Sequence, residues 1–182
     1  EVLARLGGGA APAAPSPEGD WGVFESLEGA VEAARQGRKA LETLAVREQV
    51  VAALRRAARV NARRLAEMAV DETGMGRVED KVRKNLLVAE RTPGPEILSP
   101  SAISGDMGLT LVENAPWGVI ASVTPSTNPA ATVINNAISM LSGGNSVVFA
   151  PHPGARRTSQ EAIRILNRAV HEETGARNLL TC

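Results

Sequence analysis

The chain has 182 residues, of which 43% are hydrophobic, enough to build the core of about one domain. Lys and Arg together number 20, as do Asp and Glu, so no net charge selects a nucleic acid or a membrane surface as a partner. No apolar run is long enough to span a membrane, no signal peptide is visible, and the single cysteine fits a reducing compartment. We therefore expect a cytoplasmic protein that binds neither nucleic acid nor membrane and, lacking any recurrent His and Cys spacing, holds no metal.

The first residues differ in composition from the rest of the chain. Glu1–Leu6 is compatible with a short helix, whereas Gly7–Gly19 is rich in Gly, Ala and Pro and has no periodicity, as flexible linkers do. The sequence does not begin with Met, and its last predicted strand has only begun where the sequence ends. We therefore expect an N-terminal fragment of a longer protein.

Three helices are predicted before residue 92. The first begins after Ser26, which can cap it, and extends to about Leu44; the second spans about Val46–Thr73 and the third about Val78–Glu90. Five arginines lie mostly off the apolar stripe of the second helix: Arg55, Arg56, Arg59, Arg63 and Arg64. We favour a solvated helix face paired with acidic side chains over a phosphate-binding cluster. A weakly alternating segment, Leu109–Asn114, predicts one strand before the next turn.

The most informative stretch starts at residue 119. Val119–Thr124 is apolar and rich in β-branched residues, as buried strands are. The turn Pro125–Pro129 follows, and Pro129 suits the first position of a helix that Asn128 or Thr127 would cap. Beyond the carboxyl end of such a strand, backbone N–H groups and the helix dipole commonly face an anionic ligand.

The same pattern repeats immediately along the chain. Ser146–Ala150 predicts a second strand, Pro151–Ala155 a second constrained turn, and Arg156–Glu173 a second helix, with a third strand starting near Leu179. Two successive β-α units imply parallel strands joined by right-handed crossovers. The predicted fold class is therefore α/β, with N-terminal helices followed by part of a doubly wound, Rossmann-like parallel sheet.

The residues ENAPWGVIASVTPSTNPAATVINNAISMLSGGNSVVFAPHPGA resemble the coenzyme A-acylating branch of the aldehyde dehydrogenase superfamily. Within that branch they are most similar to the propionaldehyde and acetaldehyde dehydrogenases of bacterial microcompartments. The resemblance covers the chain from Trp21 onward, including ETGMGRVEDK (Glu72–Lys81) and RTPG (Arg91–Gly94). It implies a truncated aldehyde dehydrogenase fold in which residues 20–182 form the N-terminal part of the NAD-binding domain. It also implies that residues 109–117 belong to an arm between subunits, and hence a homo-oligomer.

The resemblance also implies a reaction and a location. Such enzymes convert a short aldehyde, coenzyme A and NAD to acyl-CoA and NADH through a cysteine thioester. Their nucleophilic cysteine belongs to a later motif, so we do not assign Cys182 to catalysis and expect residues 1–182 alone to be inactive. Residues 1–19 resemble the tail and tether that direct related enzymes into the microcompartment lumen, with shell proteins as partners; a frayed terminus is the alternative.

Two candidate oxyanion donors follow from the resemblance. Most aldehyde dehydrogenases carry Pro-x-Asn-x-Pro, whose Asn amide binds the oxyanion; in this sequence Thr127 occupies the matching position and Asn128 follows it. Either side chain could donate a hydrogen bond, and both could simply cap the helix. Which of the two serves the oxyanion stays open at this point.

The predicted cofactor turn departs from the family pattern. Typical NAD-dependent members place a Lys and, three residues later, a Glu on the adenosine ribose, where this chain has Ala150 and Pro153. His152 is then the polar group available at the turn. The candidate cofactor-binding residues are Val123, Thr124, Pro125, Ser126, Pro151, His152 and Pro153.

Two other functions remain open. One is an ordinary, carboxylate-forming aldehyde dehydrogenase, which Thr127 and the Pro151–Pro153 turn disfavour. The other is a non-catalytic binding or scaffold fragment associated with a microcompartment. A nucleophilic cysteine motif further along the reading frame would distinguish the enzyme from the scaffold. The choice between NAD and NADP, and the length of the aldehyde, are not predicted.

Overall fold

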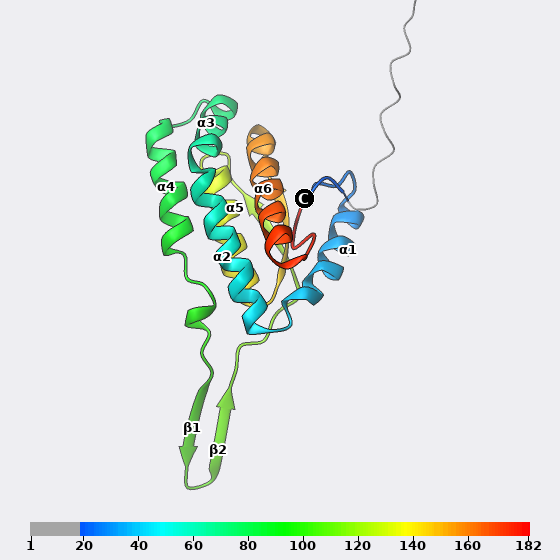
Figure 1. The fold of residues 1–182 in the computed structure, drawn as a ribbon, viewed down its shortest axis with the longest axis vertical. Coiled ribbons are helices and arrows are strands. Elements are labelled where there is room, and N and C mark those ends of the chain that lie inside the picture. The colour runs from blue at the N-terminus through cyan, green and yellow to red at the C-terminus, as the bar shows by residue number, and fades with distance from the viewer. Residues whose placement is uncertain (1–18) are drawn as a thin grey trace, which may run out of the picture.

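The structure is a computed structural model that describes residues 19–182. The predicted tail helix Glu1–Leu6 and the predicted linker Gly7–Gly19, apart from its last residue, lie outside the described residues. The remainder forms a body of helices and parallel strands from which a two-stranded hairpin projects (Figure 1).

The helices and strands follow the chain in an order close to the prediction. The helices are α1 (Leu27–Gly37), α2 (Leu44–Val60), α3 (Ala62–Thr73), α4 (Val78–Arg91), α5 (Pro129–Ser142) and α6 (Arg156–Thr174). The strands are β1 (Ser101–Gly105), β2 (Gly108–Val112), β3 (Val119–Thr124), β4 (Ser146–Pro151) and β5 (Leu180–Thr181). Short 3-10 turns are η1 (Arg38–Leu41), η2 (Pro95–Ile97) and η3 (Pro153–Ala155).

The strands β3, β4 and β5 form a parallel sheet in that order, and α5 and α6 are its crossovers. This confirms the predicted fold class. Alternate residues of β4 separate the two faces: Val147 and Phe149 belong to the main core with α2, α5 and α6, whereas Val148 packs against Ala30 and Ala34 of α1. The layers are therefore α1, the sheet, α5 with α6, and an outer layer of α2, α3 and α4 (Figure 1).

The helix predicted over Val46–Thr73 is wrong as one element. It is divided at Asn61, whose backbone leaves the helical region at φ −99° and ψ 8°. The Asn61 side chain donates a hydrogen bond to the Ala57 carbonyl at 2.9 Å. Short polar side chains compete in this way with the backbone ladder, and apolar periodicity alone does not register it.

The other predicted helices differ only at their ends. Ser26 caps α1 as predicted, accepting a hydrogen bond from the Gly29 N–H at 3.1 Å. The first helix nevertheless ends at Gly37 and continues as the turn η1 instead of reaching Leu44. The third predicted helix is confirmed as α4, with one more residue at its end.

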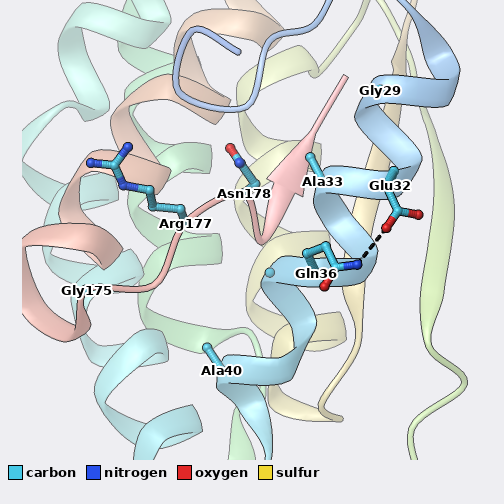
Figure 2. Close-up of a pocket in the computed structure, with 9 residues that line it drawn as sticks. Gly29, Glu32, Ala33, Gln36, Ala40, Gly175, Arg177 and Asn178 are labelled. Atoms are coloured by element: carbon cyan, nitrogen blue, oxygen red, sulfur yellow. Dashed lines mark hydrogen bonds between the residues drawn. The ribbon is translucent and has the colours of Figure 1, made fainter. Parts of the chain in front are cut away.

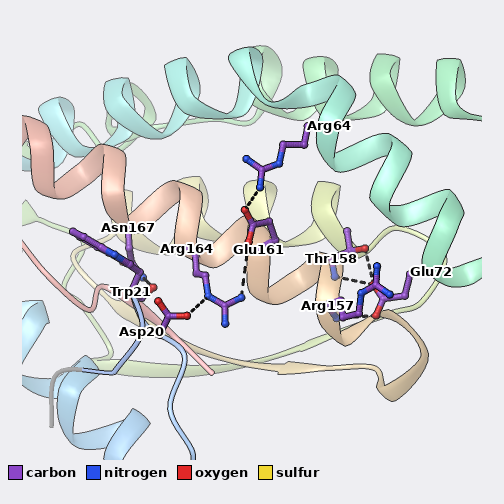
Figure 3. Close-up of polar contacts among 9 residues, drawn as sticks. All are labelled: Asp20, Trp21, Arg64, Glu72, Arg157, Thr158, Glu161, Arg164 and Asn167. Atoms are coloured by element: carbon purple, nitrogen blue, oxygen red, sulfur yellow. Dashed lines mark hydrogen bonds and ion pairs between the residues drawn. The ribbon is translucent and has the colours of Figure 1, made fainter. Parts of the chain in front are cut away.

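Four of the five arginines in this cluster, all but Arg59, form an ion pair with an acidic side chain among the described residues, in agreement with the favoured interpretation. Arg56 pairs with Glu173, Arg63 with Glu79, and Arg64 with Glu161. Figure 3 shows Arg64 on Glu161, which also lies near Arg164. Arg55 also donates to the backbone carbonyls of Ala89 and Thr92 and so satisfies the end of α4.

The hairpin β1–β2 was only half predicted. β2 corresponds to the predicted strand Leu109–Asn114, but β1 was missed, and the two pair antiparallel from Ser101↔Val112 to Gly105↔Gly108. Every residue of both strands is exposed, including Ile103, Leu109 and Leu111. Because neither face is covered, alternation of polar and apolar residues gives little signal in β1.

Residues 20–24 run beside the end of β5 and are hydrogen-bonded to Cys182. The Cys182 N–H donates to the Gly22 carbonyl at 2.9 Å, and the Phe24 N–H donates to the Cys182 carbonyl at 2.8 Å. The buried amide of Asn167 donates to the Trp21 carbonyl (Figure 3) and to the Leu180 carbonyl. Gly22 has φ +98°, and a Cβ there would lie 2.2 Å from the Leu180 oxygen, so only glycine fits.

Candidate functional site

The two predicted turns lie together at the carboxyl edge of the sheet. Val123 pairs with Ala150 and Thr124 with Pro151 in the β3–β4 register. The His152 N–H then donates to the Thr124 carbonyl at 3.0 Å, so the hydrogen bonding continues past the end of both strands. The turns that follow the two predicted strands therefore lie on one edge of the sheet.

The first turn leads into α5, and lysines of α4 hold it. Lys81 Nζ donates to the Thr127 carbonyl at 2.8 Å, and Lys84 Nζ donates to Asn128 Oδ1 at 3.2 Å. Asn128 Nδ2 in turn lies 3.4 Å from Thr127 Oγ1. Asn128 occupies the N-cap position but makes no side-chain cap to α5, so the predicted capping role is not observed.

Sequence reasoning missed both lysines. The predicted stripe of the third helix was Val78, Val82, Leu86 and Ala89, but the residues that α4 buries are Lys81, Asn85 and Ala89. Asn85 donates to the Ala62 carbonyl at 3.0 Å, which satisfies its amide inside the helical layer. The available signal was the three-residue spacing of the lysines, which places them on one helix face.

Positive charge gathers at this turn. Lys81 is only 7% exposed, and burial, with a further contribution from the nearby Lys84 charge, lowers the pKa of its ammonium group. The N-terminus of α5 adds the positive end of a helix dipole, and its first turn contains no acidic residue. The turn therefore favours a negative charge placed beside it.

A chain of side-chain hydrogen bonds fixes α5 against α4 and β3. Thr92 Oγ1 donates to Asn135 Oδ1 at 2.9 Å, and Asn135 Nδ2 donates to Asn136 Oδ1 at 3.0 Å. Asn136 Nδ2 then donates to the buried Ser122 Oγ at 2.8 Å. Because each member is paired, the helix that begins at the first turn has little freedom to rotate.

The second turn presents His152. Its side chain is exposed, and Nδ1 accepts a hydrogen bond from the Gly154 N–H at 3.1 Å. In the neutral ring the proton then lies on Nε2, which is left as a donor. Pro151 is half-buried and Pro153 is exposed on either side of it.

The helix that follows this turn already carries an anion at its N-terminus. Glu72 accepts hydrogen bonds from the N–H groups of Arg157 and Thr158, both at 2.7 Å, and from Thr158 Oγ1 at 2.6 Å (Figure 3). Partial burial alone would raise the pKa of Glu72, but the hydrogen bonds from Thr158 and Arg157 outweigh it and lower that pKa. The start of α6 is therefore occupied by a carboxylate of α3.

Small apolar side chains form the surface between the turns. Val123 is 81% exposed and Ala150 is exposed beside it, on the face that α1 covers only nearer the start of the strands, at Val119 and Val148. Pro125 and Thr127 are exposed, while Ser126 and Asn128 are half-buried. These exposed apolar side chains, with hydrogen-bond donors of the turns beside them, are compatible with a bound nucleotide.

The predicted contribution of Thr124 is limited to its backbone. Its side chain is 1% exposed on the opposite, covered face of β3, and its hydroxyl has no hydrogen-bond partner among the described residues. Its carbonyl is the acceptor for His152.

Cys182 has the environment of a core thiol. It is half-buried and packs against the main core, and burial raises the pKa of its thiol, although a hydrogen bond with Gln160 acts in the opposite direction. A raised pKa keeps the thiol protonated and weakly nucleophilic at neutral pH. This agrees with leaving Cys182 out of the catalytic residues.

A groove of about 600 Å³ elsewhere in the molecule is a less suitable site (Figure 2). It lies between α1 and the connection from α6 to β5, and is lined in part by Glu32, Gln36, Arg177 and Asn178. Gln36 donates to Glu32 at 2.6 Å, so these two polar groups satisfy each other. Because Asn178 precedes β5, this groove is at the amino end of the strands, opposite the turns.

Within residues 19–182, no group of His, Cys, Asp and Glu could hold a metal ion. No helix there is both long enough and apolar enough to cross a membrane.

The parallel sheet with two β-α turns at its carboxyl edge defines an α/β protein with part of a doubly wound sheet. The aldehyde dehydrogenase family matches residues 23–181, and the chain belongs to that family.

The chain is 66% identical over 162 residues to an acetaldehyde dehydrogenase (acetylating) of Bilophila wadsworthia, covering 89% of this chain and 34% of that protein. A propionaldehyde dehydrogenase from the Clostridium phytofermentans fucose utilisation bacterial microcompartment is similar in structure, with a TM-score of 0.86 at 46% identity over 88% of this chain and 38% of that one. An engineered glycolyl-CoA reductase with bound NADP+ gives a TM-score of 0.85 at 42% identity, covering 93% of this chain and 38% of that one.

These findings confirm the resemblance drawn from the TPSTNP and PHP turns: the relatives are CoA-acylating aldehyde dehydrogenases, some of them from microcompartments. The chain spans about a third of the length of those relatives.

Proposed function

We propose that residues 20–182 are the N-terminal part of the NAD-binding domain of a CoA-acylating aldehyde dehydrogenase. The reaction is aldehyde + coenzyme A + NAD+ → acyl-CoA + NADH + H+. The observation that carries the proposal is the continuous hydrogen bonding of the two turns, from Thr124 to His152, at one edge of a parallel sheet. The similarity to an acetylating dehydrogenase and to a glycolyl-CoA reductase supports the acyl-CoA product.

The first turn would stabilise the negative charge that develops on the aldehyde oxygen. When a cysteine thiolate from beyond this chain adds to the carbonyl carbon, the C–S bond forms and the carbonyl π pair moves onto oxygen. Donors from Thr127 or Asn128, with the positive end of α5, would face that oxygen. NAD+ supplies the hydride acceptor, and coenzyme A then displaces the cysteine thiolate from the acyl group.

The second turn would hold the cofactor without the Lys and Glu that are typical of the family. Val123 and Ala150 offer an apolar surface to the nucleotide, with the turn residues Pro125, Ser126, Pro151 and Pro153 at its rim. His152 Nε2, left free as a donor when Nδ1 accepts from Gly154, would bind a ribose hydroxyl.

The test is turnover by the complete reading frame that contains these residues. Aldehyde, NAD+ and coenzyme A are supplied, NADH absorbance is followed, and the products are separated by mass spectrometry. We expect NADH and acyl-CoA in equal amounts, formed only when coenzyme A is present. NADH with a carboxylic acid and no need for coenzyme A would indicate the carboxylate-forming alternative, and no turnover would favour the scaffold. We also propose that residues 1–182 alone give no NADH.

The hairpin and the tail extend the proposal to assembly. The exposed β1–β2 hairpin, which includes residues 109–112 of the proposed arm 109–117, carries several apolar side chains and suits a contact between subunits of a homo-oligomer. Residues 1–19 would direct the enzyme to the lumen of a microcompartment and to its shell proteins. A relative from a fucose utilisation microcompartment supports this location.

A further inference from the structure

We propose that Thr127 is the hydroxyl donor to the aldehyde oxygen, and that Lys84 and Lys81 of α4 are positioning residues that hold this donor in place. The inference rests on the proposed CoA-acylating function and deepens it by assigning separate roles within one turn. It starts from the chain of contacts that runs from α4 through Asn128 to Thr127.

Lys84 fixes the orientation of the Asn128 side-chain amide. An ammonium group has only hydrogens to offer, so the atom of Asn128 that lies 3.2 Å from Lys84 Nζ is the amide oxygen. The NH2 group must then face the other way, toward Thr127 Oγ1 at 3.4 Å. Lys84 therefore makes Asn128 a hydrogen-bond donor to the threonine.

The threonine hydroxyl gains a defined role from this arrangement. A hydroxyl has one proton to give and two lone pairs to accept with. Since Thr127 Oγ1 accepts from Asn128, its own proton is left for another acceptor. No acceptor for that proton is found among the described residues, and Thr127 is exposed at the carboxyl edge of the sheet.

Lys81 fixes the backbone of the same residue. Its ammonium group, on a side chain that is 7% exposed, donates to the Thr127 carbonyl at 2.8 Å. Lys81 thus holds Thr127 directly at its carbonyl, and Lys84 holds the Thr127 hydroxyl through Asn128. Lys81 contacts the Thr127 carbonyl and Lys84 contacts the Asn128 side chain, and neither contacts the Thr127 hydroxyl, so both act as positioning residues.

If the turn only had to start α5, the contacts from Lys84 to Asn128 and from Asn128 to Thr127 would not be required. An uncharged N-cap would satisfy the start of α5, yet Asn128 makes no such cap and uses its oxygen for Lys84 instead. The hydrogen bonds of the turn instead run from Lys84 to Asn128 and from Asn128 to the Thr127 hydroxyl.

The test compares kcat among variants of the complete enzyme. We expect Thr127→Val to lower kcat about 100-fold, as the loss of one oxyanion donor does, and Thr127→Ser to retain most activity. Lys84→Met should lower kcat about tenfold with KM for the aldehyde unchanged, because only the orientation of the donor is lost. Lys84→Arg, which keeps the donor, should restore activity to within about threefold of the wild type.

Arg83→Met is the matched control. Arg83 precedes Lys84 on α4, is exposed, and lies 3.7 Å from Asp80. Its replacement deletes one positive charge without touching the turn. Its kcat should stay within about twofold of the wild type, since an exposed charge contributes little. Melting temperatures of all variants report whether the fold is intact.

The double variant Lys84→Met/Thr127→Val separates the roles. If Lys84 acts through the Thr127 hydroxyl, the double variant is no slower than Thr127→Val alone. Additive losses, an unchanged kcat in Lys84→Met, or a large loss in Asn128→Ala with none in Thr127→Val would each overturn the inference. A wild-type enzyme that forms no acyl-CoA would instead overturn the proposed function, and this inference with it.

Discussion

Replacing the carboxylate of Glu72 tests whether this side chain stabilises the start of α6, the helix that follows the second turn. Glu72→Gln removes the charge at the N-terminus of α6 and leaves one amide oxygen for three donors from Arg157 and Thr158. Loss of a cap costs about 0.5–2 kcal/mol, and loss of the favourable charge on the helix dipole about 0.3–1 kcal/mol. Because Glu72 is half-exposed and Gln retains one acceptor, we expect a net cost of about 1.4 kcal/mol.

Hydrogen exchange of the complete protein measures this cost where it arises. A cost of about 1.4 kcal/mol is a tenfold change in an opening equilibrium, so the amides of Arg157 and Thr158 should exchange about tenfold faster in the variant. Glu67→Gln is the matched control, because Glu67 lies on the same helix, is exposed, and is 3.9 Å from Arg63 instead of at the start of α6. Its exchange at the start of α6 should match the wild type.

The pH dependence gives the sign of the effect. The folded pKa of Glu72 is lowered, so its stabilisation is fully present above the ordinary glutamate value of about 4.3 and is lost as pH falls through the folded pKa. The difference between wild type and Glu72→Gln should therefore be full at about pH 7 and should shrink below about pH 4. Equal exchange in the two proteins at pH 7, or a difference that persists in strong acid, would refute the capping role.

Three further outcomes follow from the described contacts. His152→Ala should weaken NAD+ binding in calorimetry without changing the melting temperature; unchanged affinity would remove His152 from the site. Gly22→Ala should destabilise the protein by more than about 2 kcal/mol in denaturant unfolding, because the new Cβ would lie 2.2 Å from the Leu180 oxygen. Gly175→Ala is the control: Gly175 also has a positive φ, but a Cβ there meets no atom within 4 Å, so the cost should be only about 1 kcal/mol. Leu109→Asp in the exposed hairpin should shift sedimentation toward smaller species, and an unchanged oligomer would exclude this strand from the interface.

The parallel sheet was predictable because its signals are local. β3 and β4 are short, mostly apolar runs, and the helices that follow them have apolar residues at helical spacing. Proline-containing turns separate each strand from its helix, and the β-α-β order then dictates parallel pairing. The two turns had to meet at one edge once the strands were parallel. No knowledge of distant contacts was needed for that step.

The missed features depend on contacts distant in sequence or on the absence of burial. Lys81 and Asn85 are polar residues at buried positions of α4, and their partners, Thr127 and Ala62, are 46 and 23 residues away. β1 is exposed on both faces, so burial places no constraint on its pattern. Apolar periodicity finds neither kind of residue, because in both cases hydrogen bonding, and not apolar burial, places them.

The two helix N-termini at the sheet edge differ in a way that separates their roles. α6 has its first N–H groups bound to Glu72, so an anionic group of a cofactor would meet a carboxylate there and be repelled. α5 has no side-chain cap and no acidic residue in its first turn, and Lys81 and Lys84 contact the residues that precede it. Negative charge is therefore favoured at the Thr127 turn, while the His152 turn is suited to neutral groups such as ribose hydroxyls. This division would place the developing oxyanion and the nucleoside on neighbouring turns, which a reaction between an aldehyde and a nicotinamide cofactor requires.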